Sequence, residues 1–166
     1  MKDKYIEECK TVQQNCTYTA ETHHILAAWH RFLAILFQTV PAIVAAVTGA
    51  LVAAGVKPPS FLWATVASSI VTAVATVMDP GKQHQAHLEA AKSFTTLKHD
   101  ARFMHEAQSH NLSDEAFAVA VENLHDRYNT LVKTVPATTR LAFELARWTI
   151  GEGRHDPDRD ASGAIK

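Results

Sequence analysis

The sequence predicts an all-α protein that joins a two-helix membrane hairpin to a helical region outside the membrane. The first observation is a run of 47 residues, 32–78, in which Lys57 carries the single formal charge. The second is that apolar residues on both sides of this run repeat every three or four positions, the period of amphipathic helices. The third is that no segment alternates apolar and polar residues as a half-buried strand does.

The N-terminal segment, 1–31, is expected to form a helix that runs on into the membrane. Tyr5, Cys9, Val12 and Cys16 repeat at spacings of four, three and four. The segment is polar and mixed in charge, so we expect no targeting peptide and expect the first membrane helix to act as the insertion signal. The two cysteines lie about 10 Å apart along such a helix, too far to bridge within one chain. We expect free thiols on a helix face in a reducing compartment, or a contact between neighbouring subunits.

Two uncharged segments, 32–56 and 61–78, predict the spanning helices of the hairpin. They contain 25 and 18 residues, or about 37 and 27 Å of helix against a hydrocarbon core of about 30 Å. The turn between them is Lys-Pro-Pro-Ser, and so short a turn places both termini on one side of the membrane. The basic residues that flank the spans are Arg31, Lys82, Lys92 and Lys98. They outnumber the lysine of the turn, which predicts cytoplasmic termini.

Both spans carry stripes of small or polar side chains, for which two interpretations remain open. The stripes allow close helix packing, with hydroxyls bonded to their own helix, or they line a water-filled path in an oligomer. The candidate lining residues are Gln38, Thr48, Thr65, Ser69, Thr72 and Thr76. The candidate helix-packing residues are Ala45, Gly49 and Ala53. The spans contain no Asp, Glu, Lys or Arg, which argues against a proton relay or an ion-coupled transporter.

The segment after the hairpin, 79–150, predicts a cytoplasmic helical region. Asp-Pro-Gly at 79–81 indicates a break, and a long helix follows over about 82–110. The next helix begins after the capping residue Ser113 and ends at Pro136. A last helix covers about 137–150, and 151–166 has the composition of a disordered tail.

The helix that ends at Pro136 carries an apolar seam with the spacing of a coiled coil. The seam residues are Phe117, Val121, Leu124, Tyr128 and Leu131. Two heptads are too few to be stable alone, so the seam must pack on another helix of the same or a neighbouring chain. We expect it to be the seam that holds an oligomer together.

No motif indicates catalysis or a bound cofactor. Ten histidines raise the question of a metal, but no three stand at ligand spacing and no Cys-x-x-Cys occurs, so we expect surface or interfacial histidines. Phosphate-binding glycine loops and nucleophile elbows are also missing. A net charge of −1 makes nucleic acid a poor partner. The basic residues of the last two helices form a solvated face or meet an anionic ligand or lipid headgroups: Arg127, Lys133, Arg140 and Arg147.

The order of these elements resembles the SLATT family, two-helix membrane effectors of bacterial conflict systems. The resemblance covers about 20–150. It rests on the hairpin with its minimal turn and on two sets of residues that follow it. The first set, leading out of the membrane, is Lys82, His87, Ala90, Ala91, Phe94 and Leu97. The second set, in the closing helix, is Leu124, Tyr128, Leu131 and Pro136.

The resemblance implies a homo-oligomeric, non-enzymatic effector of anti-phage defence that opens the bacterial inner membrane when a partner signals infection. No cyclase or sensor domain is fused to this chain, so a separately encoded partner is implied, such as a nucleotide cyclase or a reverse transcriptase. The trigger is then a cyclic nucleotide, a nucleic acid or a protein contact. Two rival hypotheses are a non-conducting membrane anchor that recruits a soluble partner and a soluble bundle that buries the hairpin in its core.

Overall fold

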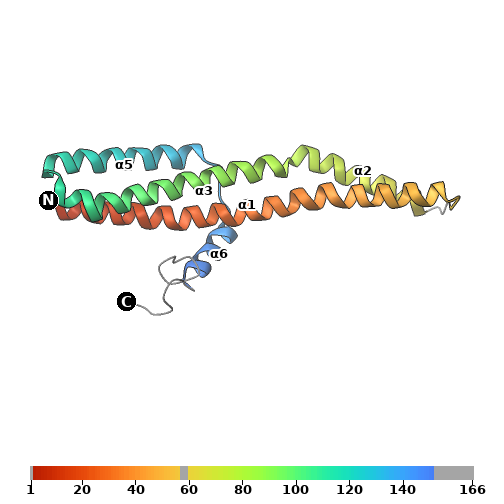
Figure 1. The fold of residues 1–166 in the computed structure, drawn as a ribbon, viewed down its shortest axis with the longest axis horizontal. Coiled ribbons are helices and arrows are strands. Elements are labelled where there is room, and N and C mark those ends of the chain that lie inside the picture. Colours follow the sequence, from red (N-terminus) through yellow and green to blue (C-terminus); the bar gives the residue numbers. More distant parts are fainter. Residues whose placement is uncertain (1, 57–59, 152–166) are drawn as a thin grey trace. The chain divides into compact units, whose positions relative to one another are not determined.

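The computed structural model describes residues 2–56 and 60–151, and every regular element within them is a helix (Figure 1). The all-α prediction is therefore confirmed. The predicted tail lies outside the described residues except for its first residue, Gly151, and so do residues 57–59 of the predicted turn. The elements are α1 (Lys2–Ala53), α2 (Ser60–Met78), α3 (Pro80–Phe103), η1 (Met104–Gln108), α4 (Ser109–Asn111), α5 (Asp114–Thr134) and α6 (Arg140–Gly151).

These elements form two compact units, which we call the hairpin and the bundle. The hairpin is Ala27–Gln85, and the bundle contains the described residues of Met1–Leu26 and Ala86–Lys166. Helix α1 belongs to both units, which confirms that the N-terminal helix continues into the first apolar segment. Helix α3 likewise begins in the hairpin and continues in the bundle.

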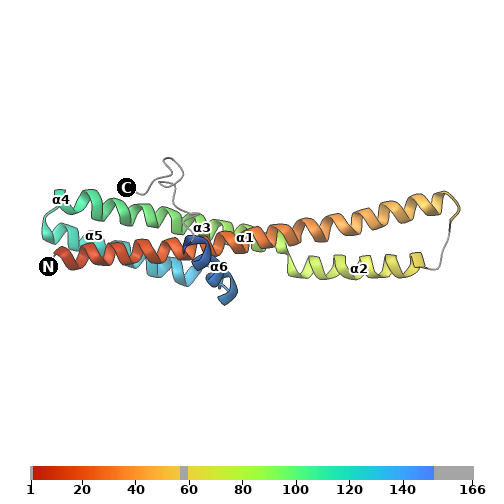
Figure 2. The ribbon, with the colours of Figure 1, turned by 90° about the horizontal axis from the view of Figure 1, so that it is seen from below.

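The bundle is built from α1, α3 and α5, which lie side by side in both views (Figures 1 and 2). Its core takes small side chains from α1 and larger ones from the other two helices, so that the helices approach closely around a few large side chains. The core residues are Cys9, Val12, Cys16, Ala20, Phe94, Leu97, Ala101, Phe117, Val121 and Leu124. Each buried Phe or Leu contributes about 1.5–3 kcal/mol through removal from water.

The seam of α5 packs inside this core, so its partners are α1 and α3 of the same chain. Phe117, Val121 and Leu124 are at most 2% exposed, and Tyr128 and Leu131 pack against them. The expectation that the seam holds an oligomer together is therefore corrected: the chain already covers it. The sequence could not choose between the two partners, because a heptad pattern specifies an apolar face and not the helix that covers it.

The ends of α5 follow the capping rules that its sequence predicts. The Ser113 hydroxyl accepts a hydrogen bond from the backbone N–H of Ala116 at 3.3 Å, and Val135 is extended, as expected for a residue before proline. Polar contacts join α5 to both neighbours. Lys2 and Glu8 of α1 lie 3.5 Å from Asp114 and 3.2 Å from His125 respectively, and Arg127 pairs with Asp100 of α3 at 2.7 Å.

Two helix boundaries differ from the sequence prediction for local reasons, and one helix contains a turn that was not predicted. The first apolar helix ends at Ala53 and not at Val56, because Gly55 has φ +82° and the N–H groups of residues 55 and 56 bond back to the carbonyls of Val52 and Leu51, as in a Schellman cap. The last helix begins at Arg140, since the Thr139 hydroxyl accepts the N–H of residue 142. The predicted helix over 82–110 contains a π-helical turn that no residue pattern announced.

Candidate functional site

The hairpin exposes an apolar surface that nothing within the described residues covers. Among these residues, two helices are long and apolar enough to cross a membrane, and none of their most apolar 18-residue windows is buried. Ile43, Val47, Trp63 and Ile70 are each more than half exposed. The rival hypothesis of a soluble bundle requires a buried hairpin, and the described residues of this chain do not bury it. A continuous exposed apolar surface of this kind indicates contact with lipid or with another protein.

The two helices of the hairpin meet along a narrow face of small and medium side chains. In α1 this face is marked by Pro41, Val44 and Thr48, which are partly covered, and in α2 by Ala64 and Ser68. A small pocket of about 230 Å³ lies along the same face. Pro41 has no N–H, so the carbonyl of the residue four positions earlier lacks its usual helical donor. Thr48, a predicted lining residue, is one of the partly covered residues of this face and so lies toward α2 of its own hairpin.

The hydroxyls of α2 bond to their own helix. Thr65, Ser69, Thr72 and Thr76 each donate to the carbonyl four residues earlier, at 2.9 Å in every case. This is the arrangement that allows a hydroxyl to face lipid or a neighbouring helix without an unpaired donor. It does not require water beside the stripe, and each hydroxyl oxygen keeps acceptor capacity for water where water is present.

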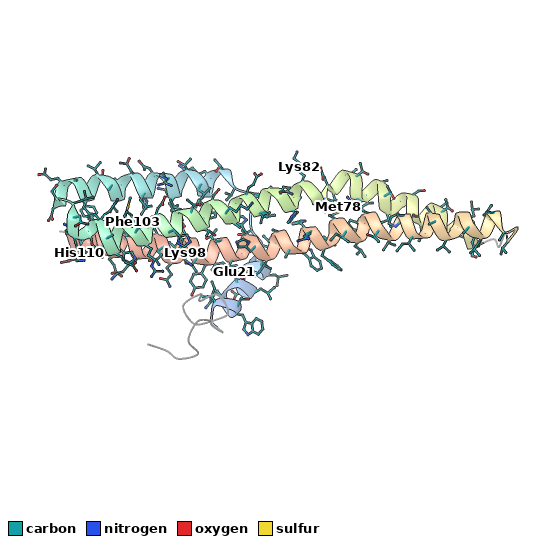
Figure 3. The ribbon with its side chains drawn as sticks, in the orientation of Figure 1. Glu21, Met78, Lys82, Lys98, Phe103 and His110 are labelled. Atoms are coloured by element: carbon teal, nitrogen blue, oxygen red, sulfur yellow. The ribbon has the colours of Figure 1, made fainter. Side chains whose placement is uncertain are left out.

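A pocket of about 520 Å³ with both polar and apolar lining brings three of the predicted lining residues together. Gln38 of α1 lines it with Thr72 and Thr76 of α2, and Asp79 closes it beyond the end of α2. Figure 3 labels Met78, the last residue of α2, and Lys82, in the first turn of α3. Thr48, Thr65 and Ser69 do not line it.

Asp79 shapes this end of the hairpin. Its φ is +40°, a left-handed conformation that Asp tolerates better than most residues, and its carboxylate accepts the backbone N–H of Lys82 at 3.1 Å. Pro80 follows at the first position of α3, where a missing N–H costs nothing. Asp79 therefore caps α3, and the sequence break predicted at Asp-Pro-Gly is confirmed. Nearby, His84 Nδ1 contacts the carbonyl of Ala27 at 2.9 Å and joins α3 to α1.

The predicted helix-packing residues do not lie between α1 and α2. Ala45, Gly49 and Ala53 are all exposed, and a side chain built at Gly49 would meet no atom within 4 Å. The expectation that they allow close packing is therefore not met within the chain, because the bulkier face containing Pro41 and Val44 makes that contact. These three positions remain available to another molecule.

Helix geometry places the small residues of α1 and the hydroxyls of α2 on one edge of the hairpin. At about 100° per residue, Gln38, Ala45 and Gly49 flank the contact face of α1 on one side, and the hydroxyl stripe flanks that of α2. Because α1 and α2 are antiparallel, these two flanks lie on the same side, and Gln38 does share a pocket with Thr72 and Thr76. The opposite edge carries large apolar residues, among them Val40, Val47, Trp63 and Val74.

The predicted anion-binding residues are not gathered into one site. Arg127 pairs with Asp100 at 2.7 Å, and Arg147 lies 3.5 Å from Glu144 on its own helix. Both pairs are exposed, so each contributes about 0–1 kcal/mol. Lys133 and Arg140 are exposed on α5 and α6 respectively. A groove of about 780 Å³ between α3 and α5 of the bundle includes Arg127 but neither Arg140 nor Arg147 of α6.

Sequence reasoning missed the environment of several titratable residues. Cys9 and Cys16 are free and fully buried, where burial raises the pKa of their thiols to about 11 and about 12. The histidines were expected at surfaces or interfaces, yet His23 and His87 are buried in contact with each other. Three or more potential metal ligands do not gather anywhere in 2–56 and 60–151.

The chain matches no protein-family model, no curated protein and no solved structure.

Proposed function

We propose that this chain is a membrane effector of bacterial anti-phage defence. Its hairpin crosses the inner membrane with both termini in the cytoplasm, and its copies assemble to open the membrane when a separately encoded partner signals infection. The observation that carries the proposal is the uncovered apolar surface of two helices of spanning length. The role in defence rests on the resemblance to the SLATT family.

The edge that carries Gly49 and the α2 hydroxyls is the surface that this proposal assigns to assembly. Small residues allow another helix to approach closely, and hydroxyls contact either that helix or water. The opposite edge, with its large apolar side chains, is suited to lipid. An opening formed this way has no charged residue within the spans, so we expect it to pass ions without strong selectivity.

A second candidate function is a non-conducting anchor that recruits a soluble partner. The self-bonded hydroxyls favour it, because all four donate within α2 and none needs a water-filled path. The anchor hypothesis predicts that an unrelated hairpin replaces 32–78 without loss of function. The effector hypothesis predicts that this replacement abolishes it.

Membrane potential in bacteria that express graded amounts of the protein separates the two functions. We expect depolarisation by the wild type, with the neighbouring genes co-expressed and the cells challenged by phage. Thr72→Trp places a bulky ring at the pocket that contains Gln38, and Ser69→Trp places one on the same edge of the hairpin. Both are expected to change the depolarisation severalfold at equal membrane abundance.

Val74→Trp is the matched control, since Val74 is 47% exposed on the opposite edge of the same helix. It is expected to leave the wild-type response unchanged. An absence of depolarisation in challenged wild-type cells would overturn the effector function and favour the anchor. Equal effects of the tryptophans on both edges would contradict the assigned edge.

A further inference from the structure

Two buried histidines, His23 of α1 and His87 of α3, contact each other inside the bundle. Their Nδ1 atoms are 2.9 Å apart and their ring centroids 5.1 Å apart. His23 is fully buried and His87 is 4% exposed. A hydrogen bond between two ring nitrogens requires that one carries a proton and the other does not. The pair therefore has its full set of interactions only when both rings are neutral or share one added proton.

The surroundings of His23 do not favour an added positive charge. Phe94 of α3 stacks on its ring with centroids 5.7 Å apart, and Tyr128 of α5 packs edge-on against Phe94. The Nε2 atom of His23 is buried and has no hydrogen-bond partner among the described residues. A proton added there would create an imidazolium in an apolar site that is closed to water.

The titratable groups around His23 come from all three packed helices. His24 follows on α1, and Glu21, also buried, lies two positions before His23 and so on a different side of α1. His87 itself comes from α3, and Tyr128 comes from α5. Burial, with the positive charge that His87 and His24 can acquire, lowers the pKa of His23 to about 4.

We propose that the His23–His87 pair is a proton-controlled contact between α1 and α3, closed when the pair is neutral and opened by protonation. The first added proton buries a charge beside Phe94, and a second leaves two N–H groups facing each other across the 2.9 Å contact. Both steps favour an open arrangement in which the rings are hydrated. Within the bundle, His23 lies four residues before Ala27 along the sequence and His87 lies two residues after Gln85. This property of the bundle holds whether or not the hairpin conducts.

Hydrogen exchange of the full chain in detergent micelles, corrected for the intrinsic pH dependence of amide exchange, tests the proposal. Between pH 7.5 and pH 5 we expect the open population of the segments around both histidines to rise about 30-fold, from the difference between an ordinary pKa of 6.5 and the value of about 4 in the closed state. His23→Phe keeps a ring that can stack on Phe94 and removes the titration, so it is expected to abolish the rise. His24→Gln, at the exposed neighbouring position, is expected to keep it.

A flat wild-type profile, or a rise that survives in His23→Phe, would overturn the proposal. A second measurement needs no variant: nitrogen-15 NMR of histidine-labelled wild-type protein. We expect His23 to remain neutral at pH 5.5. Titration of all ten histidines near pH 6.5 would contradict the proposal.

Discussion

Leu124→Asp is expected to unfold the bundle, with a loss of free energy of unfolding of about 4 kcal/mol or more. Leu124 is 1% exposed and packs in the core formed by α1, α3 and α5. The substitution removes the buried side chain and places a carboxylate in an apolar core. Thermal unfolding in detergent, followed by circular dichroism, measures the effect. The stability of Leu124→Ala should lie between those of Leu124→Asp and the wild type.

Val132→Asp is the matched control because it introduces the same charge on the same helix. Val132 is 48% exposed, so the change in free energy of unfolding should stay within about 0.5 kcal/mol. Equal stabilities for the two aspartate variants would contradict the placement of the seam in the core. If instead Leu124→Asp dissociated an oligomer and left each chain folded, the seam would belong between chains.

The double variant Val47→Arg, Ile70→Arg is expected to lose stable membrane association. Both residues are more than half exposed and lie near the centres of the two apolar segments. An arginine at the centre of a spanning helix costs about 2.5–3.5 kcal/mol on the insertion scale, so two would cost about 5–7 kcal/mol. The measurement is the fraction of protein that stays in the membrane pellet after an alkaline carbonate wash.

Phe103→Arg provides the control for an exposed aromatic residue outside the hairpin. Phe103 is 57% exposed on α3, within the bundle, and should tolerate arginine with no change in the pelleted fraction. Full retention of the double variant in the pellet would show that Val47 and Ile70 do not face lipid.

Most helices were predictable because their signals are local. The uncharged runs, the cap at Ser113 and the Asp-Pro-Gly break each act within a few residues, and each is found where the sequence indicated. The end of α1 before Gly55 was also predictable from the sequence, since a glycine in the left-handed conformation commonly follows the end of a helix. The prediction of the first span extended past it because the absence of charge alone does not define a helix end.

The remaining features depend on contacts between distant residues, which periodicity does not specify. The partner of the α5 seam and the burial of Cys16 follow from how three helices pack together. The contact between His23 and His87 joins positions 64 apart in the chain. The partner of Gly49 could not be predicted for the same reason. Its spacing with Ala45 permits close helix packing but does not specify which helix packs there.

Cysteine labelling from outside intact cells tests the central claim, that the hairpin crosses the membrane with both ends inside. Ala54→Cys places a thiol at the tip of the hairpin and Asn111→Cys places one in the bundle, both at exposed positions. The native thiols should not react with the label, since Cys9 and Cys16 are buried and their raised pKa values leave little reactive thiolate. With a membrane-impermeant maleimide, we predict that the cysteine at position 54 is labelled in intact cells and that the cysteine at position 111 is labelled only after lysis. Labelling of position 54 only after lysis, or of both positions before it, would contradict the account.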